Sequence, residues 1–185
     1  MNAAADTDIH SLRGRLIGGR VSVRPFTAGD ISNVYLGWLR DPEVVRYSSQ
    51  RFRTHTAESC QSYLVSFTGS ANHFLAICDR EIGTMLGTMT VYRSVPHGTA
   101  DIGIMVGERS AWGQGIGAEA FCLVMSALQA SGVIRKVTAG TLSVNGGMVR
   151  IFEKAGMRHE ATRNAQELVD GVPVDVVYYA RFCHD

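Results

Sequence analysis

Three glycines alternate with other residues in the segment 112–117, which reads Trp-Gly-Gln-Gly-Ile-Gly. Glycine lacks a Cβ atom, so successive backbone N–H groups of such a segment can point into one concavity. A helical pattern follows directly, and the first N–H groups of a helix have no partner within it. These donors, together with the positive end of the helix dipole, form an anion site. A doubly charged diphosphate fits this site without requiring a lysine.

The spacing of the glycines separates several kinds of phosphate-binding loop. A P-loop is excluded, because Gly-Lys followed by Ser or Thr does not occur in the chain. The dinucleotide pattern G-x-G-x-x-G/A is satisfied by Gly113, Gly115 and Ala118, but it also needs an acidic residue about 20 positions later. No Asp or Glu lies between Ala120 and Phe152, which argues against a Rossmann fold. A tight turn without a ligand stays open as an alternative.

The elements around this segment are predicted from hydrophobic periodicity. A strand is predicted over 100–106, then a helix over 115–130 with Gly132 at the position of a C-terminal cap, and a strand over 136–142. A short helix is expected after Asn145, because apolar residues follow it at helical spacing. The alternative is a hairpin turn, since Asn-Gly favours a type I′ turn.

The rest of the chain is predicted to supply more strands and two helices. Thr27 and Asp30 have the spacing of a capping box and predict a helix that ends at Asp41, before Pro42. Short links between neighbouring strands favour an antiparallel meander. The remaining predictions are strands over 21–26, 73–78, 85–93 and 174–182, a helix over 56–67, and a tight turn at Asp170 and Gly171. The expected class is α/β, more closely an α+β mixed sheet covered by helices.

Composition limits the kinds of protein that fit. The chain has 185 residues, 45% of them hydrophobic and 19% charged, which is typical of a globular protein. We expect a flexible N-terminal arm over 1–15 and a single domain over 16–185. A net charge of +1, without a run of like charges, argues against nucleic acid as a partner. No apolar stretch is long enough to span a membrane and no signal peptide is recognisable, so a cytoplasmic location is expected.

The cysteines and histidines do not have the spacing of metal ligands. The four cysteines form no C-x-x-C pair and are expected to be reduced core residues, and the six histidines show no H-x-x-x-H pattern. We therefore expect no catalytic metal.

The segment 112–117 resembles the acetyl-CoA loop of the GNAT superfamily, R/Q-x-x-G-x-G/A, with Trp112 in place of the usual Arg or Gln. In this substitution the segment resembles the RimJ/RimL-like subgroup, in which it is common. Three further segments agree with the family in order and spacing, namely 16–26, 38–44 and 145–157. The resemblance covers about residues 16 to 182.

This resemblance implies the GNAT fold and acetyl-CoA as cofactor. The implied fold is a mostly antiparallel sheet with one splayed parallel strand pair and about four helices. The pantetheine arm of acetyl-CoA would lie between the strands 100–106 and 136–142, held by main-chain groups of the first strand. The implied cofactor-binding residues are Ile104, Met105, Val106, Trp112, Gly113, Gln114, Gly115, Ile116, Gly117 and Asn145. Asn145 could equally be a helix N-cap, and the two roles are compatible.

Acid and base residues depart from the family pattern. The usual general-acid Tyr is replaced by Phe152, and the usual Glu corresponds roughly to Gly140. Asp101 is the preferred catalytic candidate, because it opens the cofactor strand and could accept a proton from the amine. His97 and His159 are two further base candidates. Three tyrosines could line an acceptor pocket, namely Tyr92, Tyr178 and Tyr179.

The resemblance leaves the acceptor open. Segment 38–44 and the ending 175–179 are most similar to family members that acetylate amino groups of nucleotide-linked sugars, so the expected partner is a small-molecule amine. The alternatives are N-terminal acetylation of a protein and a non-catalytic domain that binds acetyl-CoA as a sensor. A homodimer is a further open partner state, and neither nucleic acid nor a membrane is expected.

Overall fold

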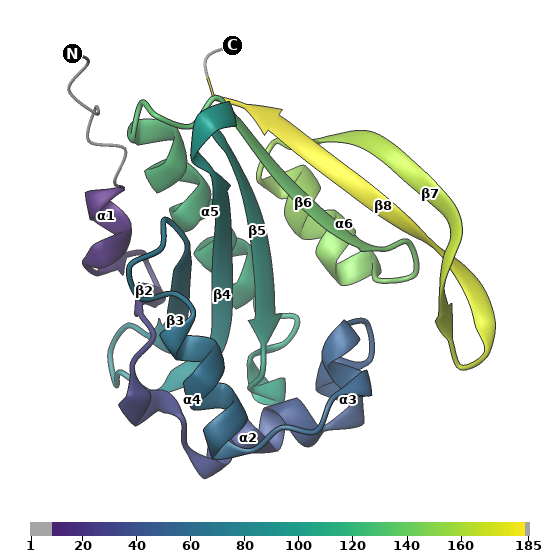
Figure 1. Ribbon diagram of the computed structural model, residues 1–185, viewed down its shortest axis with the longest axis horizontal. Helices are drawn as coiled ribbons and strands as arrows, with labels where there is room; N and C mark the ends of the chain where they lie inside the picture. The colour runs from purple at the N-terminus through teal and green to yellow at the C-terminus, as the bar shows by residue number, and fades with distance from the viewer. Residues whose placement is uncertain (1–8, 184–185) are drawn as a thin grey trace.

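The computed structural model describes residues 9–183, and its centre is one mixed sheet of eight strands (Figure 1). The strand order across the sheet is β1-β2-β3-β4-β5-β6-β8-β7. The strands are β1 (Leu16–Ile17), β2 (Val21–Pro25), β3 (His73–Asp79), β4 (Met85–Ser94), β5 (Thr99–Val106), β6 (Lys136–Leu142), β7 (Arg158–Val169) and β8 (Val172–Phe182). Among these strands only β5 and β6 pair in parallel. The predicted antiparallel meander and splayed parallel pair are therefore confirmed.

Helices cover both faces of the sheet (Figure 1). They are α1 (His10–Arg13), α2 (Asn33–Arg40), α3 (Pro42–Val45), α4 (Ala57–Val65), α5 (Ile116–Ala130) and α6 (Gly146–Lys154). Alternate residues of β3 show the two faces, since Leu75 and Ile77 belong to a core cluster that includes α5, while Phe74 and Ala76 pack with α2 and α4. The sheet is thus buried on both sides around β3.

The predicted flexible arm over 1–15 is corrected in its second half. Residues 1–8 lie outside the described residues, but α1 packs against the sheet with Ile9 and Leu12 only 1% exposed. Both side chains belong to the core cluster under α5. Residues 9–15 are therefore part of the folded structure.

The first predicted helix begins later than its sequence signal. Thr27 and Asp30 do form a capping box, but it closes a single 3-10 turn, Ala28–Asp30. The helix α2 starts at Asn33, where the hydroxyl of Ser32 accepts a hydrogen bond from the amide of Tyr35 at 3.3 Å. The helix α2 ends at Arg40, before Asp41, as predicted. Asp41 is the N-cap of the following helix, α3.

The C-terminal hairpin is predicted only in part. Asp170 and Gly171 both have positive φ, 50° and 78°, as a type I′ turn requires, so the predicted tight turn is confirmed. The strand before it, β7, is missing from the prediction, because almost all of its residues are exposed and show no alternation of apolar and polar residues. The helix after Asn145 is also confirmed, and the alternative hairpin turn at this position is wrong.

Candidate active site

A fork in the sheet creates the main cleft of the molecule. The strands β5 and β6 are paired at only three positions, and the last of these joins Asp101 to Thr138. Beyond that point the two strands diverge (Figure 1), so their facing main-chain groups have no partner strand. A cleft of about 760 Å³ lies there, lined by both strands, the glycine-rich loop, α6 and the segment 43–48.

The glycine-rich loop brings free amides to one end of this cleft. Gly113 and Gly115 have φ of 73° and 81°, in the left-handed region that glycine tolerates best. Gly115 is also the N-cap of α5 and offers no side chain to cap it. The amide of Glu119 donates the first hydrogen bond within α5, to the carbonyl of Gly115 at 3.0 Å. The amides of residues 116–118 precede that bond, and these residues line the cleft.

Side chains around the loop hold it in this shape. The indole Nε1 of Trp112 donates to the carbonyl of Val106 at 2.8 Å, which fastens the loop to the end of β5. Gln114 donates from its side chain to the carbonyl of Ser110 at 2.7 Å, and Arg20 donates to the carbonyl of Gln114 at 2.5 Å. The loop is therefore preorganised for a ligand.

The predicted cofactor residues gather at the cleft with one exception. The predicted residues that line it are Ile104, Met105, Val106, Trp112, Gly113, Gly115, Ile116, Gly117 and Asn145. Gln114 does not line it, because its side chain folds back onto Ser110. Asn145 caps α6 by accepting from the amide of Met148 at 3.3 Å and donates to the hydroxyl of Thr141 at 3.1 Å.

Asp101 lies at the base of the fork. Its carboxylate accepts a hydrogen bond from the hydroxyl of Thr138 at 2.6 Å. Burial of the carboxylate raises the pKa of Asp101, and the bond from Thr138 opposes that shift without cancelling it. The residue is nevertheless exposed to solvent, so a proton can reach it. None of the three base candidates, Asp101, His97 and His159, lines the cleft, but Asp101 adjoins the lining residue Ile102.

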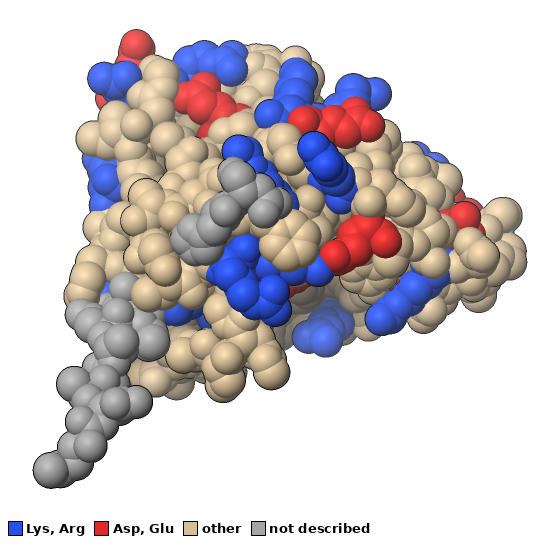
Figure 2. All heavy atoms as spheres, turned by 90° about the horizontal axis from the view of Figure 1, so that it is seen from above, with Lys and Arg blue, Asp and Glu red and all other residues tan. Residues whose placement is uncertain are grey.

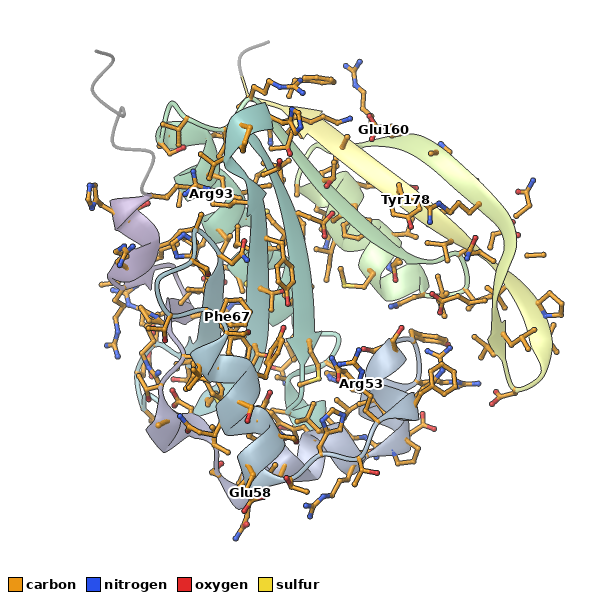
Figure 3. All side chains as sticks on the ribbon, in the orientation of Figure 1. Arg53, Glu58, Phe67, Arg93, Glu160 and Tyr178 are labelled. Atoms are coloured by element: carbon orange, nitrogen blue, oxygen red, sulfur yellow. The ribbon has the colours of Figure 1, made fainter. Side chains whose placement is uncertain are left out.

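The two departures from the family pattern have visible structural causes. Phe152 is fully buried between Phe121 and Tyr179, with ring centroids 5.7 and 5.3 Å away, so it presents nothing to the cleft. Gly140 lines the cleft opposite Tyr178 of β8, which Figure 3 labels. A Cβ atom at Gly140 would lie 3.0 Å from the ring of Tyr178, so a glutamate side chain there would require the ring to move by a few tenths of an ångström.

Besides Thr141 of β6, six polar or charged side chains of the cleft are absent from the sequence prediction. They come from the segment after α2 and from α6, and are Glu43, Arg46, Tyr47, Ser48, Arg150 and Lys154. Their place in the cleft depends on the packing of segments far apart in the chain. Only the i, i+4 spacing of Arg150 and Lys154, which places both on one face of α6, is a signal that the sequence contains.

No group of metal-binding side chains was found among residues 9–183. In that same part of the chain, no helix has the length and apolar character needed to cross a membrane.

The profile of the acetyltransferase (GNAT) domain matches residues 20–158, three quarters of the chain. The chain belongs to the GNAT acetyltransferase family. Membership makes it an acetyl-CoA-dependent N-acetyltransferase, and the fork and glycine-rich loop are where the resemblance of the sequence implied them. No curated protein sequence matches the chain significantly.

Solved structures with the same fold are distant in sequence. A GNAT acetyltransferase from Bacillus anthracis is 18% identical with a TM-score of 0.78, and the match covers 92% of this chain and 99% of that one. RimL, a ribosomal L7/L12 N-terminal acetyltransferase solved with coenzyme A, is 16% identical with a TM-score of 0.77, covering 91% and 97%. The microcin C7 immunity acetyltransferase MccE, solved with acetyl-CoA and AMP, is 15% identical with a TM-score of 0.78, covering 94% and 99%. At these identities the likeness concerns the fold.

Proposed function

We propose that this acetyltransferase moves the acetyl group of acetyl-CoA to the primary amine of a small molecule. The observation that carries the proposal is the fork between β5 and β6, which opens into a cleft with free amides at one end. Asp101 lies at the base of the fork, next to the lining residue Ile102. Val106 lies five positions after Asp101, a distance of roughly 16 Å along an extended strand. An extended arm held along β5 would span this distance.

The diphosphate of acetyl-CoA is assigned to the amides at the start of α5. These amides have no partner in the first turn, and the left-handed glycines keep Cβ atoms out of the approach. The residues at 104–106 would hold the pantetheine arm through main-chain groups on the side of β5 that faces the gap. The carbonyl of Val106 already accepts from Trp112, so in this proposal Trp112 positions the loop.

The reaction requires a neutral amine. An alkylammonium has a pKa near 10, so at neutral pH a base must take its proton before nitrogen can attack the thioester carbonyl. Asp101 is the proposed base, directly or through one water, because its raised pKa makes it a stronger proton acceptor than an ordinary carboxylate. The carbon–sulfur bond then breaks, and the thiolate takes a proton from water, because Phe152 supplies none. Backbone N–H groups facing the gap stabilise the oxyanion.

Two other functions have specific observations behind them. RimL is named for acetylating a ribosomal protein, which keeps a protein N-terminus as a second acceptor class. The missing hydroxyl at Phe152 keeps the sensor alternative, a domain that binds acetyl-CoA without turnover. A small acceptor is preferred because the segment 43–48 lines the cleft and Arg46 in it pairs with Asp170 of the β7–β8 turn, so both segments border the open side of the fork.

The test combines calorimetry with a thiol-release assay. We expect acetyl-CoA to bind with one site per chain, and free thiol to appear with amino sugars or other small amines and not with peptides. Turnover on peptide N-termini alone would transfer the function to protein acetylation. Tight binding without turnover on any amine would leave the sensor.

A further inference from the structure

A second pocket, of about 510 Å³, adjoins the cleft. Arg46 lines both cavities, so the two are neighbours. One wall of the second pocket is the segment from Leu39 to His55, and the other is the hairpin turn at Val169 and Asp170. An ion pair between Arg46 and Asp170, at 3.7 Å, joins the two walls.

The lining of this pocket is dominated by positive charge. Its arginines are Arg40, Arg46, Arg51 and Arg53, which together with His55 we call the basic pocket. Asp170 is the one carboxylate among the lining residues. On the face of the molecule shown in Figure 2, by contrast, Lys and Arg side chains are interspersed with Asp and Glu.

Two of the arginines pair with no carboxylate within residues 9–183. Arg51 is already engaged, by Glu167 at 3.6 Å and by the carbonyls of Ser48 and Leu168. Arg40 donates a single hydrogen bond, to the carbonyl of His55 at 3.1 Å, and makes no ion pair with the described residues. The guanidinium of Arg53 makes neither a hydrogen bond nor an ion pair within residues 9–183. Arg53 lies next to α3 at the end of the molecule towards which β5 and β6 diverge (Figure 3).

We propose that the basic pocket binds a phosphate group carried by the acceptor amine. Guanidinium groups match the oxygens of phosphate through paired N–H donors, and several of them converging on a cavity favour an anion there. With the phosphate in the basic pocket, the amine lies across Arg46 in the cleft. The proposal rests on the proposed function and narrows its substrate class to small amines that carry a phosphate or diphosphate.

An acidic peptide is the rival occupant. The basic pocket lies between two walls that the exposed Arg46–Asp170 pair links, and this shape favours a compact group over a continuing polypeptide. A phosphate group and an acidic peptide would contact the same guanidinium groups, so the experiment measures the binding of each one separately.

The test uses inorganic pyrophosphate as probe in a Gly115→Val background, which removes the phosphate site of the glycine-rich loop. We expect one pyrophosphate to bind per chain by calorimetry. Adding Arg53→Gln should weaken this binding by about tenfold or more, and Arg40→Gln should do the same, since a hydrogen bond to a charged group is being removed. Adding Arg158→Gln should change nothing, because Arg158 is exposed on β7 and lines neither cavity.

The outcomes separate this proposal from the one before it. No pyrophosphate binding, or equal binding with and without Arg53, would overturn the phosphate assignment while acetyl-CoA still bound to the wild-type chain. Binding of an acidic peptide without measurable binding of pyrophosphate would overturn it as well. In the wild-type chain, glucosamine 6-phosphate and glucosamine are compared as acceptors. Arg53→Gln should raise the KM of the phosphorylated amine alone and leave kcat unchanged.

Discussion

Replacing Gly115 with valine tests directly whether the glycine-rich loop binds the diphosphate. Its φ of 81° places it in the left-handed region, and a Cβ atom there would lie 3.1 Å from Nη2 of Arg20. A β-branched residue at this φ costs at least the roughly 1–2 kcal/mol typical of a left-handed L-residue. The replacement Gly115→Val therefore forces the loop towards another backbone conformation, and the first amides of α5 turn with it.

The size of the effect follows from the donors that are lost. Displacing two amides that donate to charged phosphate oxygens removes about 1.5 to 3 kcal/mol for each. Acetyl-CoA affinity should therefore fall by about 150-fold or more, since every 1.4 kcal/mol is a factor of about ten. Ala111 and Ile116 at the ends of the loop belong to the core cluster, so some stability should be lost, but the sheet is built from other segments and the fold should be retained.

The assay is calorimetric titration with acetyl-CoA, accompanied by thermal denaturation. Gly132→Val is the matched control, because Gly132 has φ 70° just beyond the other end of α5 and no atom within 4 Å of its Cβ position. Both variants should lose similar stability, and only Gly115→Val should lose affinity. Equal affinity of the two variants would refute the assignment of the phosphates to this loop.

Three further changes test other parts of the structure. Asp101→Asn should lower kcat/KM by about 100-fold or more. The same variant should have a higher melting temperature at pH 7, because the raised pKa of Asp101 means that its charged carboxylate destabilises the folded state. This gain in stability should fade as the pH falls towards the ordinary pKa of an aspartate, where the carboxylate is protonated. Asp30→Asn should cost about 1.5 to 3 kcal/mol at pH 7, because it breaks the paired hydrogen bonds from Arg24 at 2.7 Å. Gly107→Ala should cost about 1 to 3 kcal/mol, because its Cβ would lie 2.1 Å from the tryptophan ring of α2.

For each of these three predictions, one outcome would contradict the reasoning. Unchanged turnover in Asp101→Asn would remove Asp101 as the base. For Asp30, burial raises the pKa, but the hydrogen bonds from Arg24 and Thr27 outweigh it and lower the pKa overall. The stability that Asp30 contributes should therefore vanish as pH falls through this lowered pKa, and a loss that persists in acid would count against the ion pair. Normal melting of Gly107→Ala would show that α2 does not press against the end of β5.

The sequence is sufficient to predict the elements whose signals are local. The alternation of β5, the helical spacing of α5 and the glycines between them all lie within residues 100–130, so the cofactor end of the cleft follows from one short stretch of chain. The predicted capping box of Thr27 and Asp30 is also present, but a capping box closes only one turn and does not determine where a longer helix begins. The predicted start of α2 is therefore too early.

Features that depend on distant packing cannot be predicted in this way. The strand β7 is exposed along almost its whole length, so burial imposes no period on its sequence. Tyr178 fills the space above Gly140 only because β8 pairs with β6. The basic pocket joins a segment near residue 46 to a hairpin turn near residue 170, and neither half shows by itself that the charges meet.

The most direct test of the account is a crystal structure of the protein with acetyl-CoA bound. The account predicts the diphosphate within hydrogen-bonding distance, about 3 Å, of the amides of residues 115–118. It also predicts the pantetheine arm along residues 104–106 and the thioester beside Asp101. A diphosphate bound elsewhere, with the loop in its present shape and free of ligand, would contradict it.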